Sequence, residues 1–359
     1  MTQSDINILD KLKKNVCVTS LKAVSVYRSD KTQFLVDDFN ENDVVIHNSI
    51  YENRQEIGAI ISVKTKFSEE CATQRVYPDT HVFPQGEMRC IRIAICSEND
   101  VVSAFDSYTT CAMTLDGSFY ICANTLEEAF KQFEIANLIA SICINVKKLG
   151  KNLATLEEKH IALYKLNVTL PLMEVLEKNL IAGENEGREQ LCSAISTLYN
   201  EGLFLDSNGA ASAKLSDDAF LITDSNKSRS SVTVDDIVLI NNGRREAGKY
   251  PSNSAALHKL IYENNDWVRS IIISHPRMSM AYSACATDID LDDRAKAIVG
   301  KVLRYPFGTT VMQSKLFSES ISEGIRAYLI ENDCLICLGK TTEEAVKITQ
   351  EVERCASGL

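Results

Sequence analysis

The sequence predicts an α/β protein made of two related domains, each with a largely antiparallel sheet. A motif of the first half recurs in the second: Ile46-His47-Asn48-Ser49-Ile50-Tyr51-Glu52-Asn53 is echoed by Leu257-His258-Lys259-Leu260-Ile261-Tyr262-Glu263-Asn264. In both halves, segments with strand-like alternation give way to segments with helical start signals. The length of 359 residues also suits two cores better than one.

The repeat extends to both sides of this motif in the same order. Ser25-Val26-Tyr27-Arg28-Ser29-Asp30 matches Ser212-Ala213-Lys214-Leu215-Ser216-Asp217, and Thr125-Leu126-Glu127-Glu128-Ala129 matches Thr341-Thr342-Glu343-Glu344-Ala345. The matched residues His47 and His258 lie 211 positions apart (258 − 47). Solenoid repeats are much shorter, so self-similarity at this interval indicates duplicated domains. We expect one domain over residues 1–150 and another over 151–359, with 151–159 as the linker.

The first half carries signals for strands and one long helix. Residues 89–96 alternate with period two, as a half-buried strand does. Asp116-Gly117 separates two apolar segments and predicts a hairpin, because glycine tolerates the positive φ of such turns. Thr125 and Glu128 have capping-box spacing, which predicts a helix from there to Gly150.

The second half predicts helices over 161–180, interrupted at Pro171, and over 187–203. Strands are expected over 219–222 and 236–240, and a last helix begins at Thr341 with Glu344 in capping-box spacing. The first half is shorter between its matched segments than the second, so part of the second domain is absent from the first.

Composition excludes several functional classes. The formal net charge is −11, whereas a nucleic-acid surface needs clustered Lys and Arg. No apolar run approaches the roughly 20 residues of a membrane helix. The N-terminus Met1-Thr2-Gln3-Ser4-Asp5-Ile6 does not resemble a secretory signal, and the 12 scattered cysteines favour reduced thiols. We therefore expect a cytoplasmic protein that binds neither nucleic acid nor membrane.

Five short segments of the second half carry a resemblance to a known protein family. They are Gly209-Ala210-Ala211-Ser212, Thr223-Asp224-Ser225-Asn226, Ser252-Asn253-Ser254, Ile273-Ser274-His275-Pro276 and Asn332-Asp333-Cys334. Their order and spacing resemble the class II aldolase/adducin family, whose members carry Gly-Asn-x-Ser, Thr-Pro-Ser-Gly, Ser-Ser-Glu, His-x-His-Pro and Asn-His-Gly there. The resemblance implies two three-layer α/β/α domains with largely antiparallel central sheets.

The metal and catalytic positions implied by this resemblance are largely substituted. In catalytic relatives three histidines hold a divalent metal and a Glu acts as acid and base. Here His275 stands at one ligand position, Ile273 and Asp333 stand at the others, and Ser254 replaces the Glu. One imidazole and one carboxylate make an incomplete catalytic zinc site, and a serine hydroxyl exchanges no proton near neutral pH. We expect no catalytic residue, metal or cofactor, with zinc as the weak alternative.

The first half departs further from the family pattern. Ser62 and Lys64 stand where the two strand histidines belong, and Asp116-Gly117 stands near the Asn-His-Gly turn. An ammonium at a metal-ligand position opposes cation binding. We interpret this copy as structural.

Hydroxyl side chains of the family's phosphate-binding segments remain in the second half. Such groups can hold an anion without a metal, but they are also ordinary turn and cap residues, so both interpretations stay open. The residues are Ser212, Thr223, Ser225, Ser252 and Ser254.

Other candidate groups are interpreted as structural. Cys334 and Cys337 have the spacing of a redox or zinc pair, but apolar residues separate them and no second pair exists. His47 and His258 are expected to make structural hydrogen bonds beside Tyr51 and Tyr262. His81 and His160 are assigned to the surface.

The functional hypothesis is a non-catalytic aldolase/adducin-like protein that acts as a scaffold, oligomerisation module or interaction module. Relatives form ring-shaped tetramers, so the resemblance implies a homo-oligomer or a protein partner. The alternative is a metal-poor lyase-like or epimerase-like protein that binds a small sugar phosphate through the second domain.

Overall fold

The computed structural model describes residues 2–28, 31–36, 39–89, 92–106, 108–167, 173–175 and 181–359. They form two compact units, Met1–Thr155 and Leu156–Leu359, and the boundary falls inside the 151–159 segment. Unit 1 and unit 2 are described separately below.

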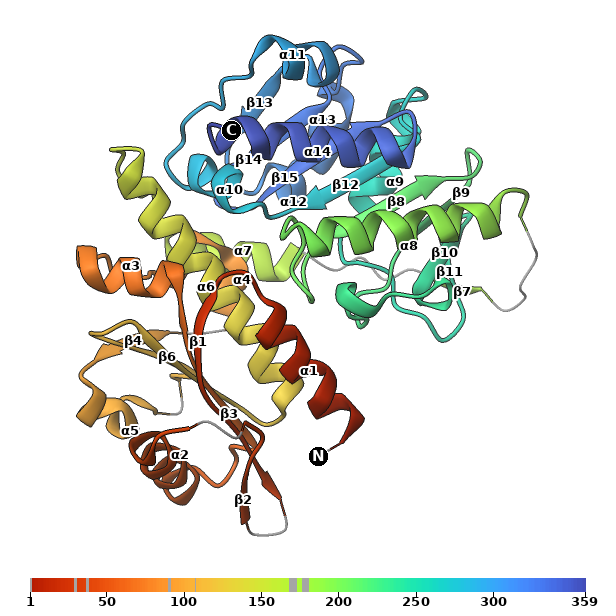
Figure 1. Ribbon diagram of the computed structural model, residues 1–359. Helices are drawn as coiled ribbons and strands as arrows, with labels where there is room; N and C mark the ends of the chain where they lie inside the picture. The colour runs from red at the N-terminus through yellow and green to blue at the C-terminus, as the bar shows by residue number, and fades with distance from the viewer. Residues whose placement is uncertain are drawn as a thin grey trace. The chain divides into compact units, whose positions relative to one another are not determined.

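Unit 1 contains a six-stranded sheet with the order β2-β1-β3-β6-β5-β4 (Figure 1). All neighbours are antiparallel except β4 and β5, which are parallel at one edge. The elements are α1 (Gln3–Lys14), β1 (Val18–Arg28), β2 (Lys31–Phe34), α2 (Glu41–Asn53), β3 (Ala59–Thr65), α3 (Lys66–Gln74), α4 (Pro84–Arg89), β4 (Ile93–Cys96), α5 (Val101–Ala104), β5 (Cys111–Thr114), β6 (Ser118–Ala123) and α6 (Leu126–Lys148), with 3₁₀ turns at Thr80–Val82 and Glu98–Asp100.

Helices cover both faces of the unit 1 sheet. Ile46 and Ile50 of α2 pack with Phe105, Ile60 and Tyr120 in one buried cluster. The other face meets α6, which contacts β3 and β6 and is flanked by α1 and α3. Successive residues of a strand point to opposite faces, so a strand covered on both sides is buried at every residue, as β6 is. Unit 1 is a three-layer α/β/α domain.

Unit 2 contains a nine-stranded sheet with the order β13-β14-β15-β12-β8-β9-β10-β11-β7. Its neighbours are antiparallel except at the two edges. The elements are α7 (Glu158–Asn167), β7 (Met173–Val175), α8 (Glu184–Asn200), β8 (Ala210–Lys214), β9 (Ala219–Thr223), β10 (Ile237–Asn241), β11 (Arg244–Glu246), α9 (Ala255–Asn264), β12 (Ser270–Ser274), α10 (Arg277–Ala284), α11 (Asp293–Val299), β13 (Val302–Tyr305), α12 (Thr309–Met312), α13 (Ser314–Ser320), β14 (Ala327–Ile330), β15 (Cys334–Gly339) and α14 (Thr342–Ala356), with 3₁₀ turns at Arg229–Ser231 and Val234–Asp236.

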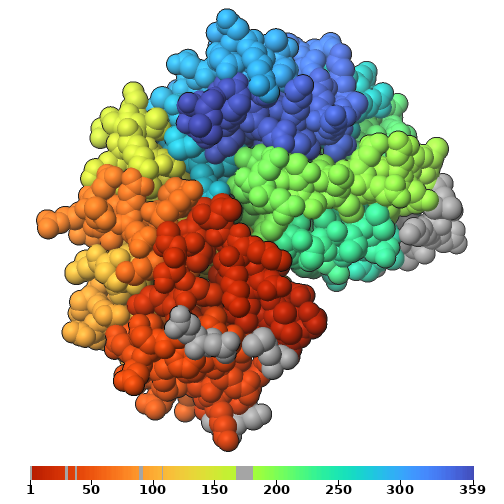
Figure 2. Space-filling view, viewed as in Figure 1, coloured from red at the N-terminus to blue at the C-terminus, as the bar shows by residue number. Residues whose placement is uncertain are grey.

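Two separate apolar clusters mark the two faces of this sheet. One joins α8, α11 and α14 to the sheet through residues such as Leu191, Ile272 and Ile348. The other joins α9 and α13 to the opposite face through Ile261 and Phe317. Helices α8 and α14 also contact each other, and they lie side by side on the surface in Figure 2. The predicted α/β class with largely antiparallel sheets between helix layers is confirmed.

The two sheets share their strand order. In unit 1 the order β4-β5-β6-β3-β1-β2 corresponds to β13-β14-β15-β12-β8-β9 in unit 2, and in both the first pair is parallel and the rest are antiparallel. Unit 2 extends this common sheet with β10, β11 and β7. Strands β10 and β11 lie in the segment that the first half lacks, and this accounts for the length difference between the repeats.

Several local predictions need correction. Residues 89–96 do not form one strand: Arg89 ends α4, residues 90 and 91 lie outside the described residues, and β4 begins at Ile93. The helix predicted over 161–180 ends at Asn167, and Met173–Val175 is a strand that pairs with β11. Residues 168–172, including Pro171, and 176–180 lie outside the described residues. Proline disfavours helix in the residue before it and removes a donor.

Each of the two predicted capping boxes has the hydrogen bond to its threonine hydroxyl. The hydroxyls of Thr125 and Thr341 accept the N–H groups of Glu128 and Glu344, so both helix starts are confirmed. The Glu344 carboxylate instead accepts the N–H of Lys340 at 2.6 Å and pairs with Arg326. The hairpin at Asp116-Gly117 is confirmed, with Gly117 at a φ of 87°.

A buried Ser-His-Tyr cluster occurs in both units, as the repeat predicts. In unit 1 the Ser25 hydroxyl contacts His47 Nδ1 at 2.7 Å and Tyr51 Oη at 3.0 Å. In unit 2 the Ser212 hydroxyl contacts the corresponding atoms of His258 and Tyr262, both at 2.6 Å. Burial lowers the pKa of each histidine to about 3. The structural role expected for both histidines agrees with these contacts.

One difference between the clusters gives a first prediction. His47 Nε2 contacts the Ser62 hydroxyl at 2.7 Å, whereas the corresponding residue of unit 2, Ile273, leaves the buried Nε2 of His258 without a partner among the described residues. Ser62→Ala should lower the free energy of unfolding of unit 1 by about 1–3 kcal/mol, because it leaves a buried ring nitrogen unsatisfied. Hydrogen exchange resolved by mass spectrometry over α2 and β3 measures this loss. The exposed Ser20→Ala is the control, and equal exchange in both variants would contradict the prediction.

Candidate functional site

The five segments singled out in the second half meet at one end of the unit 2 sheet. Asp224 forms a bridge with Pro251, and Thr223 O accepts the Ser252 N–H at 2.9 Å. Ser274 pairs with Leu335, so His275 and Asp333 lie at the same end of the neighbouring strands β12 and β15. The structure therefore brings these segments together at one end of the sheet. Several of the side chains in these segments form hydrogen bonds with groups elsewhere in unit 2.

The loop at 223–226, where relatives have Thr-Pro-Ser-Gly, is filled by the carboxylate of Asp224. This carboxylate accepts the Asn226 N–H at 2.8 Å and the Tyr250 N–H at 3.1 Å. The Ser225 N–H and hydroxyl both donate to Tyr250 O. Backbone N–H groups in a turn are what an anion would bind, and here an internal anion already accepts two of them.

A buried guanidinium holds the same loop from the other side. Arg229 Nε donates to Gly209 O at 3.1 Å and Nη1 donates to Asp224 O at 2.8 Å. Burial lowers the pKa of Arg229 to about 10, against the opposing effect of Asp206 and Asp224. The sequence analysis missed Arg229 because it lies outside the family-like segments.

The predicted ligand-binding hydroxyls are not free to converge on a ligand. Ser212 is fully buried in the cluster with His258 described above. Ser252 and Ser254 contact each other at 3.0 Å. Thr223 differs from the rest, because its hydroxyl is buried and has no partner within the described part of the chain.

The two residual ligand-position residues differ in environment. His275 is buried, and burial lowers its pKa to about 4. The Asp333 carboxylate accepts the Tyr164 hydroxyl at 3.2 Å on one oxygen and the Thr310 hydroxyl at 3.1 Å on the other. Burial raises the pKa of Asp333 to about 6. Within the described residues, no three His, Cys, Asp or Glu side chains are grouped so as to hold a metal.

Tyr164 is a site residue that the sequence analysis missed. It lies on α7, and its ring stacks on Phe307 with centroids 5.6 Å apart. His160 of the same helix lies 6.4 Å from the Phe307 ring. The contact with Asp333 joins residues far apart in sequence, and no local pattern signals it.

Part of unit 2 matches a known protein family. Residues 189–358 match the family model described as Class II Aldolase and Adducin N-terminal domain. These residues form a class II aldolase domain. The match lies within unit 2, and the domain spans α8 to α14 except for the first residues of α8.

Two curated relatives match this class II aldolase domain. A 3-oxo-tetronate 4-phosphate decarboxylase of Haemophilus influenzae is 24% identical over 171 residues, which cover 45% of this chain and 80% of the relative. An L-fuculose phosphate aldolase of Methanococcus maripaludis is 27% identical over 164 residues, covering 44% and 88%. A solved structure of YgbL from Klebsiella pneumoniae, described as a putative aldolase/epimerase/decarboxylase, is 19% identical with a TM-score of 0.44, covering 50% of this chain and 90% of that one.

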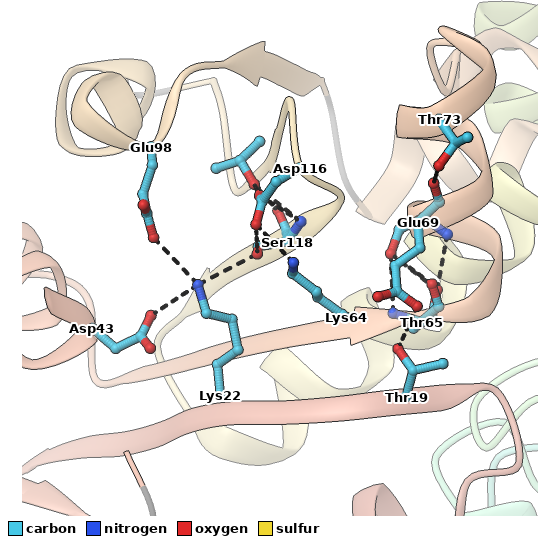
Figure 3. A network of polar contacts seen from close by, with 12 residues as sticks. Thr19, Lys22, Asp43, Lys64, Thr65, Glu69, Thr73, Glu98, Asp116 and Ser118 are labelled. Atoms are coloured by element: carbon cyan, nitrogen blue, oxygen red, sulfur yellow. Dashed lines mark hydrogen bonds and ion pairs between the residues drawn. The ribbon is translucent and has the colours of Figure 1, made fainter. Parts of the chain in front are cut away.

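The positions of unit 1 that correspond to the class II aldolase site carry a charged network, shown in Figure 3. Lys64 corresponds to His275 in the repeat, and its Nζ lies 2.7 Å from Asp116 Oδ2. Two further members, Lys22 and Asp43, were missed by the sequence analysis. Asp43 lies four residues before His47, as Ser254 lies four before His258, so the repeat contained a signal for it.

The remaining candidates lie in the core or at the surface. Cys334 and Cys337 are buried on β15, and burial raises the pKa of both thiols, that of Cys337 to about 12. His81 and His160 are partly exposed. Among the described residues, no helix is both long and apolar enough to span a membrane.

Proposed function

We propose that this chain is a non-catalytic class II aldolase-like protein that acts as a scaffold, oligomerisation module or interaction module. The observation that carries the proposal is that the chain's own groups engage the loop and the acidic ligand position of the site. Asp224 accepts the backbone N–H of Asn226 in the loop and that of Tyr250 in the neighbouring segment, and Tyr164 and Thr310 donate to Asp333.

The groups that remain do not fit the chemistry of catalytic relatives. A catalytic zinc site ordinarily takes three protein ligands, and this site offers one imidazole and one carboxylate that is already hydrogen-bonded. A protonated Asp333 would also be a poor ligand, and its raised pKa favours that form below about pH 6. The position of the catalytic Glu holds Ser254, which contacts Ser252. These residues therefore offer neither a carboxylate for proton transfer at the position of Ser254 nor a complete set of metal ligands for carbonyl polarisation.

Surface features of unit 2 are compatible with an interaction role. A groove of about 320 Å³ is lined by Phe307, Met312 and Leu316, among others. Leu316 is 64% exposed and Met312 is 45% exposed, so apolar surface lies at this groove. We propose a second copy of the chain as the partner, which would give a homo-oligomer.

A thermal-shift screen of pentose and hexose phosphates tests the proposal, with the chain's size measured by light scattering. We expect no sugar phosphate to raise the unfolding temperature, and a mass above that of the monomer. The second candidate function, a sugar-phosphate-binding lyase without the usual metal set, is favoured by the unpartnered Thr223 hydroxyl and by the phosphate-processing relatives. A specific stabilisation that His275→Ala abolishes would establish this second function and contradict the first.

A further inference from the structure

The unit 1 sheet ends at an open edge where the unit 2 sheet continues. Strand β2 is the last strand of the unit 1 sheet, and no strand among the described residues pairs with its outer side (Figure 1). Its counterpart β9 lies inside the unit 2 sheet and pairs antiparallel with β10. An edge strand presents backbone N–H and C=O groups with which another strand can pair. The repeat therefore indicates that this position of the fold accepts an antiparallel strand.

Two residues of β2 turn their backbone groups towards this edge. The Leu35 N–H donates to Val24 O at 2.8 Å, so these two residues form a hydrogen-bonded pair. Such pairs alternate with non-hydrogen-bonded ones, so the N–H and C=O groups of Thr32 and Phe34 point away from β1. Tyr27, which lies opposite Thr32, donates its N–H to the residue before β3 instead. The outer side of β2 thus offers two donors and two acceptors.

The corresponding positions of β9 are the ones that pair with β10. Phe34 lies opposite Ser25 in unit 1, and Ile222 lies opposite Ser212, the repeat equivalent of Ser25. Ile222 in turn pairs with Val238 of β10. The position two residues earlier in β9 pairs with β10 in the same way. A further strand beside β2 is therefore compatible with the fold that the two units share.

Side chains along this edge are incompletely covered. Lys31 and Gln33 are exposed, and Thr32 and Phe34 are partly exposed. Phe39, whose ring lies 4.7 Å from that of Phe34, is 39% exposed. In unit 2 the apolar cluster on the α9 side is extended by residues of β10, which have no counterpart among the described strands of unit 1. A strand beside β2 would cover apolar surface as well as backbone groups.

We propose that β2 of a second copy of the chain pairs antiparallel with this edge and joins the two unit 1 sheets into one. The outward groups set the register, with Thr32 of each copy opposite Phe34 of the other and Gln33 opposite Gln33 on the two-fold axis. Each pair of Thr32 and Phe34 exchanges two N–H···O bonds, so the contact has four. An isologous contact of this kind pairs the same surface on both copies.

The sequence of β2 is complementary to itself in this register. A β-branched residue opposite an aromatic one, as Thr32 and Phe34 would be, is a favourable cross-strand pair. The amides of the two Gln33 side chains can donate to and accept from each other. The two copies of Lys31 are four residues of strand apart, about 13 Å, so like charges do not meet. These features favour a second copy over an unrelated peptide.

The inference rests on the homo-oligomer proposed above and gives it a contact on unit 1. This edge and the groove of unit 2 are separate surfaces, so each can be tested without the other. The pairing is also independent of whether unit 2 binds a sugar phosphate.

Disulfide cross-linking of Gln33→Cys in the full chain tests the register. The introduced thiols lie in a non-hydrogen-bonded pair, whose Cα atoms are about 4.5 Å apart and within reach of a disulfide. Mild oxidation should give a covalent dimer in which mass spectrometry finds position 33 linked to position 33. Lys31→Cys is the matched control and should not link to itself. The unsubstituted chain controls for the native cysteines.

A proline at the outward position tests the backbone bonds. Thr32→Pro removes one outward N–H from each copy and leaves the bonds between β1 and β2 in place, as edge strands tolerate. Two of the four bonds are lost, so self-association measured by sedimentation velocity should weaken at least about tenfold. Thr32→Val keeps the N–H and the branched shape and should associate like the unsubstituted chain. Circular dichroism of each variant separates weaker association from loss of fold.

The outcomes distinguish this inference from the proposed function. Absence of the 33-to-33 link overturns the inference, as does equal self-association of Thr32→Pro and Thr32→Val. A mass above that of the monomer without the link would overturn the contact at β2 and leave the homo-oligomer standing. A link in a chain that a sugar phosphate stabilises would uphold the contact while the non-catalytic function fails. If the edge instead binds a peptide of another protein, the pure chain stays unlinked and the inference is wrong.

Discussion

Replacing Asp224 by alanine should lower the free energy of unfolding of unit 2 by about 2–4 kcal/mol, because it leaves two N–H groups without their acceptor and removes one of the two carboxylates that offset the charge of a buried arginine. The N–H groups are those of Asn226 and Tyr250, and the arginine is Arg229, whose pKa is lowered by burial and partly raised again by Asp206 and Asp224. Urea unfolding followed by the fluorescence of Trp267, the only tryptophan, measures the loss in unit 2.

The same variant should respond to inorganic phosphate. The freed loop offers N–H donors and a nearby guanidinium, so phosphate should recover part of the lost stability in Asp224→Ala while leaving the unsubstituted chain unchanged. Asp293→Ala is the control, because that side chain is fully exposed and its partner Lys296 is exposed as well. An unchanged unfolding midpoint for Asp224→Ala would show that the carboxylate does not support the loop.

Asp333→Asn should stabilise unit 2 above pH 6 by about 2 kcal/mol. Burial raises the pKa of Asp333 to about 6 in the folded chain, whereas an unfolded aspartate titrates near 3.9. The folded state therefore binds this proton more tightly. The stabilisation that results from protonation of Asp333 is complete below about pH 4 and is lost as the pH rises through 6. The neutral amide of Asp333→Asn cannot ionise, so the variant does not lose stability in this way.

Urea unfolding of both chains between pH 4 and pH 8 measures the difference. The stability of Asp333→Asn relative to the unsubstituted chain should increase with pH up to about 7 and then level off. Tyr164→Phe removes one donor and should raise the pKa of Asp333 further, which moves the rise to higher pH. A constant difference at every pH would mean that Asp333 is not a buried, titrating carboxyl.

The sequence allowed the fold to be predicted well because its strongest signals lie in the core. The repeated His and Tyr of α2 and α9 occupy equivalent buried clusters in both units. The hairpin at Gly117 and the threonine caps are set by local backbone chemistry. The failures are local as well: Arg89 belongs to α4 where a strand was predicted, and Met173–Val175 is a strand where a helix was predicted.

The site was predicted less completely, because its decisive contacts are long-range. The positions of His275 and Asp333 follow from the family-like spacing, but the engagement of Asp333 by Tyr164 depends on how α7 packs. Asp224 was visible in the loop segment, whereas its hydrogen bond from Tyr250 was not. In unit 1, Lys22 and Asp43 come from different elements and meet only in the folded sheet.

Metal content per chain is the most direct test of the account. Elemental analysis of the protein purified without chelators, compared with His275→Ala prepared in the same way, should find no stoichiometric zinc, manganese or iron in either. The account predicts this because the site retains one imidazole and a hydrogen-bonded carboxyl. About one equivalent of a divalent metal in the unsubstituted chain, absent from His275→Ala, would contradict the non-catalytic function.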